Sequence, residues 1–150
     1  MNKLLGYLSF RGRSNRARFW LTNVTVYVAF LVGALIAMML SELSPLISLV
    51  FLPVLAGILL AAIANSARRL HDRNKSAWWL ILFAIVPAFF SLFAAAGPAA
   101  GGTKEATDFI ELLGAPFSIW GLVEMGFLKG SPGPNKYGDD PLQTTSEVFA

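Results

Sequence analysis

The longest uninterrupted feature of the sequence is an apolar run from Phe19 to Ser41 without a single charged side chain. A helix of about 20 mostly apolar residues is long enough to cross the hydrocarbon core of a bilayer. It also satisfies all of its own backbone polar groups there, which an open strand or loop cannot do. The run therefore predicts a transmembrane α-helix. It exceeds the apolar stretch of a secretory signal peptide, so we expect it to be retained.

Three further apolar segments follow, at about 46–67, 78–96 and 109–128. The last contains Glu111 and Glu124. Together with the first span, at about 19–41, they predict an all-α fold, a membrane bundle of four transmembrane helices. We expect residues 1–150 to form a single integral membrane domain.

Composition excludes the ordinary soluble and disordered classes. Charged residues make up 14% of the chain and apolar residues 55%, whereas soluble domains average roughly 25% charged residues. The absence of cysteine excludes disulfides, thiolate nucleophiles and cysteine-based metal sites. A zinc site needs three or four protein ligands, and the chain has one histidine. We therefore expect no metal and no cofactor.

Basic residues are distributed unevenly among the segments that flank the spans. One set of flanking segments, 1–18, 68–77 and 129–150, holds eleven of the twelve Lys and Arg residues, and the opposite loops hold only Lys104. Short cytoplasmic loops of membrane proteins carry the excess of Lys and Arg. The distribution predicts that both termini and the 68–77 loop are cytoplasmic. The net charge of +3 then favours anionic lipid rather than nucleic acid as the partner.

Several of these cytoplasmic side chains are candidates for binding an anion or a lipid headgroup, because basic side chains and helix N-termini both attract phosphate. We expect Ser14 and Ser76 to cap the helices that begin beside them. The anion-binding candidates are Arg11, Arg13, Arg16, Arg68, Arg69, His71, Arg73 and Lys75.

The central loop also contains an aspartate next to the histidine. If the preceding helix continues past Ala67, then Arg68 and Arg69 lie four and three residues before Asp72, and both are within reach of it. This favours a structural role for the loop. A His71–Asp72 acid/base pair is the alternative, but the sequence offers it no nucleophile.

Three polar residues, Asn23, Asn65 and Glu124, lie inside the predicted spans near the cytoplasmic boundary. Intramembrane ionisable residues are expected to have a partner or a function. We expect Glu124 to pair with Arg16, Arg68 or Arg69, and a transport role is the alternative.

Three motifs stand in order along the chain: "FRGRSNRARFW" from Phe10, "ARRLHDRNKSAWW" from Ala67, and "KGSPGPNKYGDDP" from Lys129. This set resembles domain of unknown function family 805, a family of small multi-pass proteins of the bacterial inner membrane. The chain departs from the family pattern at Ala77, where glycine is usual.

The resemblance implies a location in the bacterial inner membrane and no established activity. The positions that match the family motifs are Arg11, Gly12, Arg13, Arg16, Arg68, Arg69, His71, Asp72, Asn135, Tyr137, Gly138, Asp140 and Pro141. Among them Asp72, Asn135, Tyr137 and Asp140 are expected to hold the three motifs together as one structural cytoplasmic cap.

Three hypotheses for function remain open. The first is a non-enzymatic membrane protein whose basic cap binds anionic phospholipid headgroups or a partner protein, either another membrane protein or a second copy. The second is a small oligomeric transporter or channel that uses Glu124. The third is a membrane enzyme that acts on a phosphate-bearing headgroup through His71 and Asp72.

Overall fold

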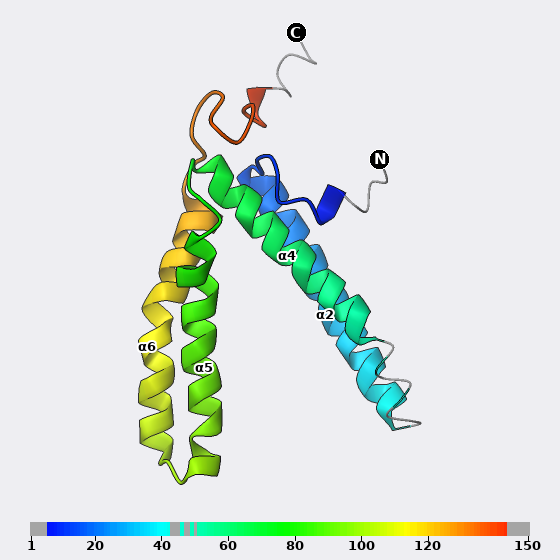
Figure 1. Ribbon diagram of the computed structural model, residues 1–150, viewed down its shortest axis with the longest axis vertical. Helices are drawn as coiled ribbons and strands as arrows, with labels where there is room; N and C mark the ends of the chain where they lie inside the picture. Colours follow the sequence, from blue (N-terminus) through cyan, green and yellow to red (C-terminus); the bar gives the residue numbers. More distant parts are fainter. Residues whose placement is uncertain (1–5, 43–45, 47–48, 50, 144–150) are drawn as a thin grey trace.

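A computed structural model describes residues 6–42, 46, 49 and 51–143. The described part is helical, with two antiparallel hairpins that meet at one end and diverge toward the other (Figure 1). The first hairpin consists of α2 (Arg16–Ser41) and α4 (Leu52–Asp72). The second consists of α5 (Val86–Ala96) and α6 (Lys104–Leu122). The predicted all-α fold with four helices is confirmed.

Irregular helical segments extend the second hairpin at both of its ends. A π-helix, Ile81–Ile85, precedes α5, and another, Val123–Phe127, continues α6. A 3₁₀ turn, Pro98–Ala100, joins the two helices. Pro87 is the second residue after the first π-helix, and a proline lacks the N–H of the regular ladder, so wider local winding before it accommodates it.

Three of the four helices are long and apolar enough to span a membrane, namely Arg16–Ser41, Leu52–Asp72 and Lys104–Phe127. The fourth, Ile81–Ala96, is apolar but shorter. The segment predicted at 78–96 is shorter as a helix because residues 77 and 78 form a turn before it.

The boundaries of the other spans differ from the prediction. Asn15, not Ser14, caps α2, because its Oδ1 accepts from the N–H of Arg18 at 2.8 Å, so the helix begins at Arg16 rather than Phe19. The second helix runs on to Asp72, so half of the predicted 68–77 loop is helical. The last helix begins at Lys104 rather than Phe109, because the hydroxyl of Thr103 caps it.

The lengthwise contact between α5 and α6 depends on small residues. A Cβ on Gly121 would lie 2.7 Å from the Cβ of Phe83, and one on Gly114 would lie 3.2 Å from the Cα of Pro87. Trp79, Phe83 and Trp120 form edge-to-face and tilted ring contacts beside this seam. Small residues of this kind let membrane helices approach closely.

Burial in this fold is concentrated at the end where the two hairpins meet. The largest side chains that are fully buried are Arg69, Leu70, Asn65 and Ser14. Apolar residues along the helices are exposed instead, as Leu21 and Met39 on α2 and Leu92 on α5 illustrate. A polar interior at one end and an apolar exterior elsewhere is the arrangement expected of helices that face lipid.

Both ends of the described chain lie at that same end of the molecule (Figure 1). The distribution of Lys and Arg predicts that this end faces the cytoplasm. Since the chain has no cysteine, single substitutions report topology directly. We expect Lys136→Cys to be protected from an impermeant thiol reagent in intact cells and Glu105→Cys to be labelled. The reverse pattern would show that the orientation is wrong.

The tight α5–α6 seam predicts a specific cost for one added methyl group. We expect Gly121→Ala to destabilise the protein by about 1–3 kcal/mol, the usual cost of overpacking, measured as a lower Tm in detergent. Gly57→Ala is the matched control, because a Cβ there meets nothing within 4 Å and alanine favours a helix. Equal effects at the two positions would contradict the packing argument.

Candidate functional site

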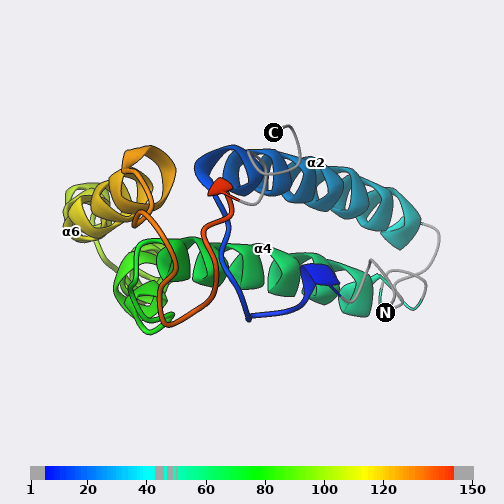
Figure 2. The ribbon, with the colours of Figure 1, turned by 90° about the horizontal axis from the view of Figure 1, so that it is seen from above.

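Three segments far apart in the sequence meet where the hairpins join, and we call residues 6–20, 68–79 and 123–143 the cap. Seen from above, the chain between residues 128 and 143 crosses over the ends of both hairpins (Figure 2). The three segments correspond to the three sequence motifs. The cap is therefore the place where the candidate site residues can act together.

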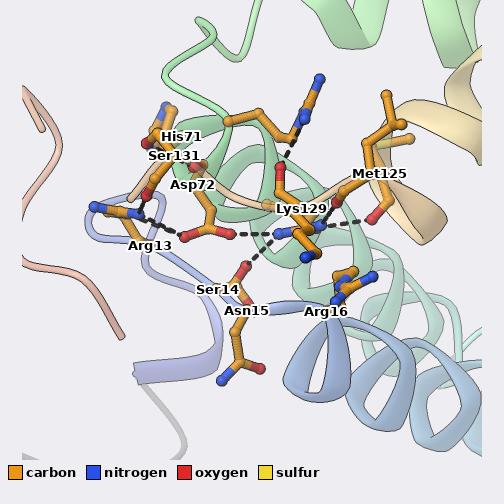
Figure 3. Close-up of polar contacts among 12 residues, drawn as sticks. Arg13, Ser14, Asn15, Arg16, His71, Asp72, Met125, Lys129 and Ser131 are labelled. Atoms are coloured by element: carbon orange, nitrogen blue, oxygen red, sulfur yellow. Dashed lines mark hydrogen bonds and ion pairs between the residues drawn. The ribbon is translucent and has the colours of Figure 1, made fainter. Parts of the chain in front are cut away.

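Asp72 lies at the centre of the cap, at the last residue of α4, and is 3% exposed. Its Oδ1 accepts from Nε of Arg13 at 3.1 Å and lies 3.0 Å from Nη2 of the same guanidinium. Its Oδ2 accepts from Nη1 of Arg69 (Figure 3). One buried carboxylate therefore joins the segment before α2 to the end of α4. Charge-assisted bonds of this kind are stronger than neutral ones.

The third segment is tied to the same residue through its backbone. The carbonyl of Asp72 accepts from the N–H of Ser131 at 2.8 Å and from its hydroxyl at 3.0 Å. Arg13 donates to the carbonyls of Ser131 and Gly133, both at 2.6 Å. Gly130 lies so close to the carboxylate that any Cβ would overlap it. Asp72 and Arg13 thus fix the chain between residues 128 and 143, which we call the tail, against both hairpins.

The last helix ends in a run of carbonyls that accept from side chains of other elements. Arg69 donates to Met125 at 2.7 Å and also to Leu128. The other three donors are Trp20 to Gly126 at 3.0 Å, Arg16 to Phe127 at 3.1 Å and Arg73 to Lys129 at 2.6 Å. Terminal carbonyls of a helix lack partners within the helix and carry its negative dipole end. Much of the basic cluster is accounted for in this way.

Glu124 has partners other than those predicted. Its Oε1 lies 2.8 Å from Nε of Arg73 and 3.0 Å from Nζ of Lys75, and the residue is 3% exposed. The prediction of Arg16, Arg68 or Arg69 was wrong. Asn74 explains why: its φ of 57° makes the left-handed turn that ends α4, and Lys75 N–H returns to the Leu70 carbonyl at 2.9 Å, as in a Schellman motif. This turn brings both cations toward Glu124.

The sequence also predicted that both Arg68 and Arg69 pair with Asp72, and for Arg68 this prediction was wrong. Arg68 donates instead to the carbonyls of Gly6 at 3.2 Å and Tyr7 at 3.5 Å. It is buried, and it holds the N-terminal segment against α4.

The two intramembrane asparagines are bonded to the backbone. Asn23 and Asn65 donate to the carbonyl of Phe19 at 2.9 and 3.1 Å. Asn65 also lies 3.3 Å from the hydroxyl of Ser14. Asn65 therefore joins α4 to α2, whereas Asn23 bonds within α2 to the carbonyl four residues before it.

His71 is turned away from the carboxylate beside it. Its ring stacks on Tyr137 with centroids 3.9 Å apart and an interplanar angle of 5°. Its Nδ1 lies 3.2 Å from the carbonyl of Gly12, which can only accept, so Nδ1 carries the proton. The carbonyl of His71 accepts from Asn135 at 3.0 Å. His71 thus links its own segment to the other two segments of the cap, but it does not form an acid/base pair with Asp72.

Asp140 shapes the tail. Its two carboxylate oxygens accept from the N–H groups of Leu142 and Gly133, each at 3.0 Å. The bond from Leu142 is the main reason that the pKa of this carboxyl lies below its usual value; burial opposes the shift, and Gly133 and the charge of Arg13 add to it. A depressed pKa means that the ionised form supports the folded tail and that this support is lost as the pH falls toward acid.

Five cations of the cap are exposed, and none has an ion pair with a carboxylate in the part of the chain that the structure describes. One of them, Arg16, donates to the carbonyl of Phe127, whereas the side chains of the other four donate no hydrogen bond to a described residue. We call them the rim: Arg11, Arg18, Lys129 and Lys136. The sequence had singled out only Arg11 among them as a candidate. Their lack of nearby carboxylates depends on the tertiary structure, so spacing gave no signal for the other three. Within the described ranges, no cluster of His, Asp or Glu could hold a metal ion.

Comparison with known proteins matches residues 7–139 to a family described as "Protein of unknown function (DUF805)". The chain is 29% identical to inner membrane protein YhaH of Escherichia coli strain K12 over 142 residues, which cover 92% of this chain and 91% of that protein. It is 24% identical to inner membrane protein YhaI of the same strain, covering 94% and 92%. No solved structure matches.

The two-arginine arrangement around Asp72 makes that carboxylate the most sensitive position of the cap. Asp72→Asn leaves Arg13 and Arg69 buried without a counter-charge. We expect this variant to lower the free energy of unfolding by about 3–5 kcal/mol. The measurement is the Tm in detergent together with protease cleavage in residues 128–143, which should accelerate. Asp139→Asn, at an exposed position of the same tail, is the control. A stable, protease-resistant Asp72→Asn protein would contradict this role.

Proposed function

This chain belongs to the DUF805 family and is a multi-pass protein of the bacterial inner membrane, and we propose that its cap binds anionic phospholipid headgroups at the cytoplasmic face. The rim carries this proposal. The other six cations of the cap are engaged by Asp72, Glu124 and backbone carbonyls, whereas the exposed rim cations have no such partner among the described residues. They are available to a ligand outside the protein.

Positive and negative charges are concentrated at opposite ends of the molecule. The described residues of the cap contain ten Lys and Arg side chains and four carboxylates, which leaves a net charge of +6. The described residues of the opposite half contain one lysine, Lys104, and four carboxylates. Each Lys or Arg near an anionic membrane surface contributes about 1 kcal/mol of attraction. This distribution supports the contact of the cap with the anionic leaflet.

Aromatic side chains mark the level at which headgroups would meet the cap. Trp78 is 76% exposed and Trp20 38% exposed, and both belong to the cap. Tyr7 and Phe10 of the N-terminal segment are also exposed. Tryptophan and tyrosine favour the membrane–water interface because their rings are amphipathic. The rim cations therefore lie in the same cap as residues suited to the headgroup region.

The two other hypotheses have less support from the site. A transport role for Glu124 needs a carboxylate that a solute or proton can reach, yet this one is buried between Arg73 and Lys75. Acid/base chemistry by His71 and Asp72 needs the two groups to cooperate. The histidine contacts Tyr137 and Gly12 instead, and both oxygens of Asp72 are held by arginines.

Neutralising part of the rim tests the proposal without touching the buried core. We expect the Arg11→Gln, Arg18→Gln, Lys136→Gln triple variant to fold normally. In nanodiscs of mixed composition, native mass spectrometry should show its preference for phosphatidylglycerol over phosphatidylcholine reduced at least about tenfold relative to the wild type, given about 1 kcal/mol per cation. High salt should reduce the preference of the wild type as well, because salt screens exposed charges.

Lys104→Gln is the matched control, since it removes one exposed cation at the opposite end. It should leave the preference unchanged. An unaltered lipid preference in the triple variant would refute headgroup binding by the rim and would leave a protein partner as the ligand of the cap.

A further inference from the structure

Two adjoining hollows open beside the start of α2, and their walls include several of the residues that hold the cap together. The first has a volume of about 320 Å³ and is lined by Arg16, Lys129 and Ser131, among others. The second, about 460 Å³, is lined by Ala17, Trp20 and Gly126. Both share Asn15, Arg16 and Leu142. They therefore form one continuous depression with a polar part and a mostly apolar part.

The polar hollow has cationic donors left over. Arg16 gives one of its five N–H donors to the carbonyl of Phe127, and its side chain has no other partner among the described residues. Lys129 is exposed, and its ammonium group has no carboxylate partner there. Both side chains lie near the buried carboxylate of Asp72 (Figure 3).

Two carboxylates also line the polar hollow, and both are already satisfied. Asp72 is held by Arg13 and Arg69, and Asp140 accepts from the N–H groups of Gly133 and Leu142. Their charge is therefore largely compensated inside the cap. The donors of Arg16 and Lys129 are what the hollow presents to a ligand, and a phosphate group fits that chemistry because it accepts several charge-assisted bonds.

The second hollow adjoins that polar part and lies between the start of α2 and the end of the last helix. Trp20 closes it on one side, with its indole N–H on the carbonyl of Gly126. Gly126 has to be small, because a Cβ there would lie 2.7 Å from the indole ring. Beyond this contact α2 and α6 diverge (Figures 1 and 2). A ligand held in both hollows would have a phosphate at the cap and an apolar portion against Ala17 and Trp20.

We propose that these linked hollows bind one anionic phospholipid, with its phosphate between Arg16 and Lys129 and the start of an acyl chain against Ala17 and Trp20. This inference rests on the proposed function and narrows it to a defined site. The other three rim cations attract lipids in general, whereas this site, to which Lys129 contributes, holds one molecule. The polar hollow alone would also suit a free phosphate ion, and the apolar hollow distinguishes the lipid.

Two variants that leave the rim residues Arg11, Arg18 and Lys136 intact test the site. Lys129→Gln removes a donor at an exposed position, and Ala17→Trp fills the apolar hollow without a change of charge. In native mass spectra of protein extracted with mild detergent, we expect the wild type to retain one phosphatidylglycerol through added washing. Each variant should retain it at least tenfold less. Unchanged Tm values would show that both variants fold.

Controls separate this site from the rim and from free phosphate. The Arg11→Gln, Arg18→Gln, Lys136→Gln protein should keep the single retained lipid even where its general preference falls. Retention in both Lys129→Gln and Ala17→Trp would overturn the site while leaving the rim proposal intact. Inorganic phosphate that raises the Tm of the wild type and of Ala17→Trp equally, with no lipid retained by either, would overturn the lipid assignment. If Ala17→Trp fails to fold, Ala17→Leu takes its place.

Discussion

The carboxylate of Asp72, held between the guanidinium groups of Arg13 and Arg69, is the interaction on which the cap depends. Three charges lie together out of water, since Arg69 is 0% and Asp72 3% exposed. Desolvating such groups is costly, and the cost is offset only if the geometry is good and the remaining donors are satisfied. Here the surplus donors reach the carbonyls of Ser131, Gly133, Met125 and Leu128. In the described part, no buried side-chain nitrogen or oxygen lacks a partner.

This core replaces the hydrophobic core of a soluble domain. Between lipid and protein there is little hydrophobic driving force, so helices in a membrane associate through packing and polar contacts. The chain divides these roles along its length. Glycines such as Gly121 allow close packing within the second hairpin, and the polar network of the cap joins the two hairpins. The exposed apolar side chains in between need no protein partner, because the acyl chains of the bilayer surround them.

The sequence predicts those features of this structure that depend on residues close together in the chain, and it misses contacts between residues that are far apart in it. The apolar runs identified the helices, because they follow from the thickness of the bilayer and are local in the chain. The pairing of charges was partly missed. Arg13 and Asp72 are 59 residues apart, so no spacing rule connects them. Arg68 and Arg69 differ by about 100° around the helix axis, and only the packed position of α4 decides which of them faces Asp72. The partners of Glu124 depend on the turn at Asn74.

The capped end of the last helix has a consequence for biogenesis. Its carbonyls from Met125 to Lys129 accept from Arg16, Trp20, Arg69 and Arg73, all of which belong to the first hairpin or to the turn after it. A ribosome makes those donors first. These contacts can therefore form only after the final turn of the last helix has been synthesised. The order of the segments along the chain therefore makes the donors available before the carbonyls that they cap.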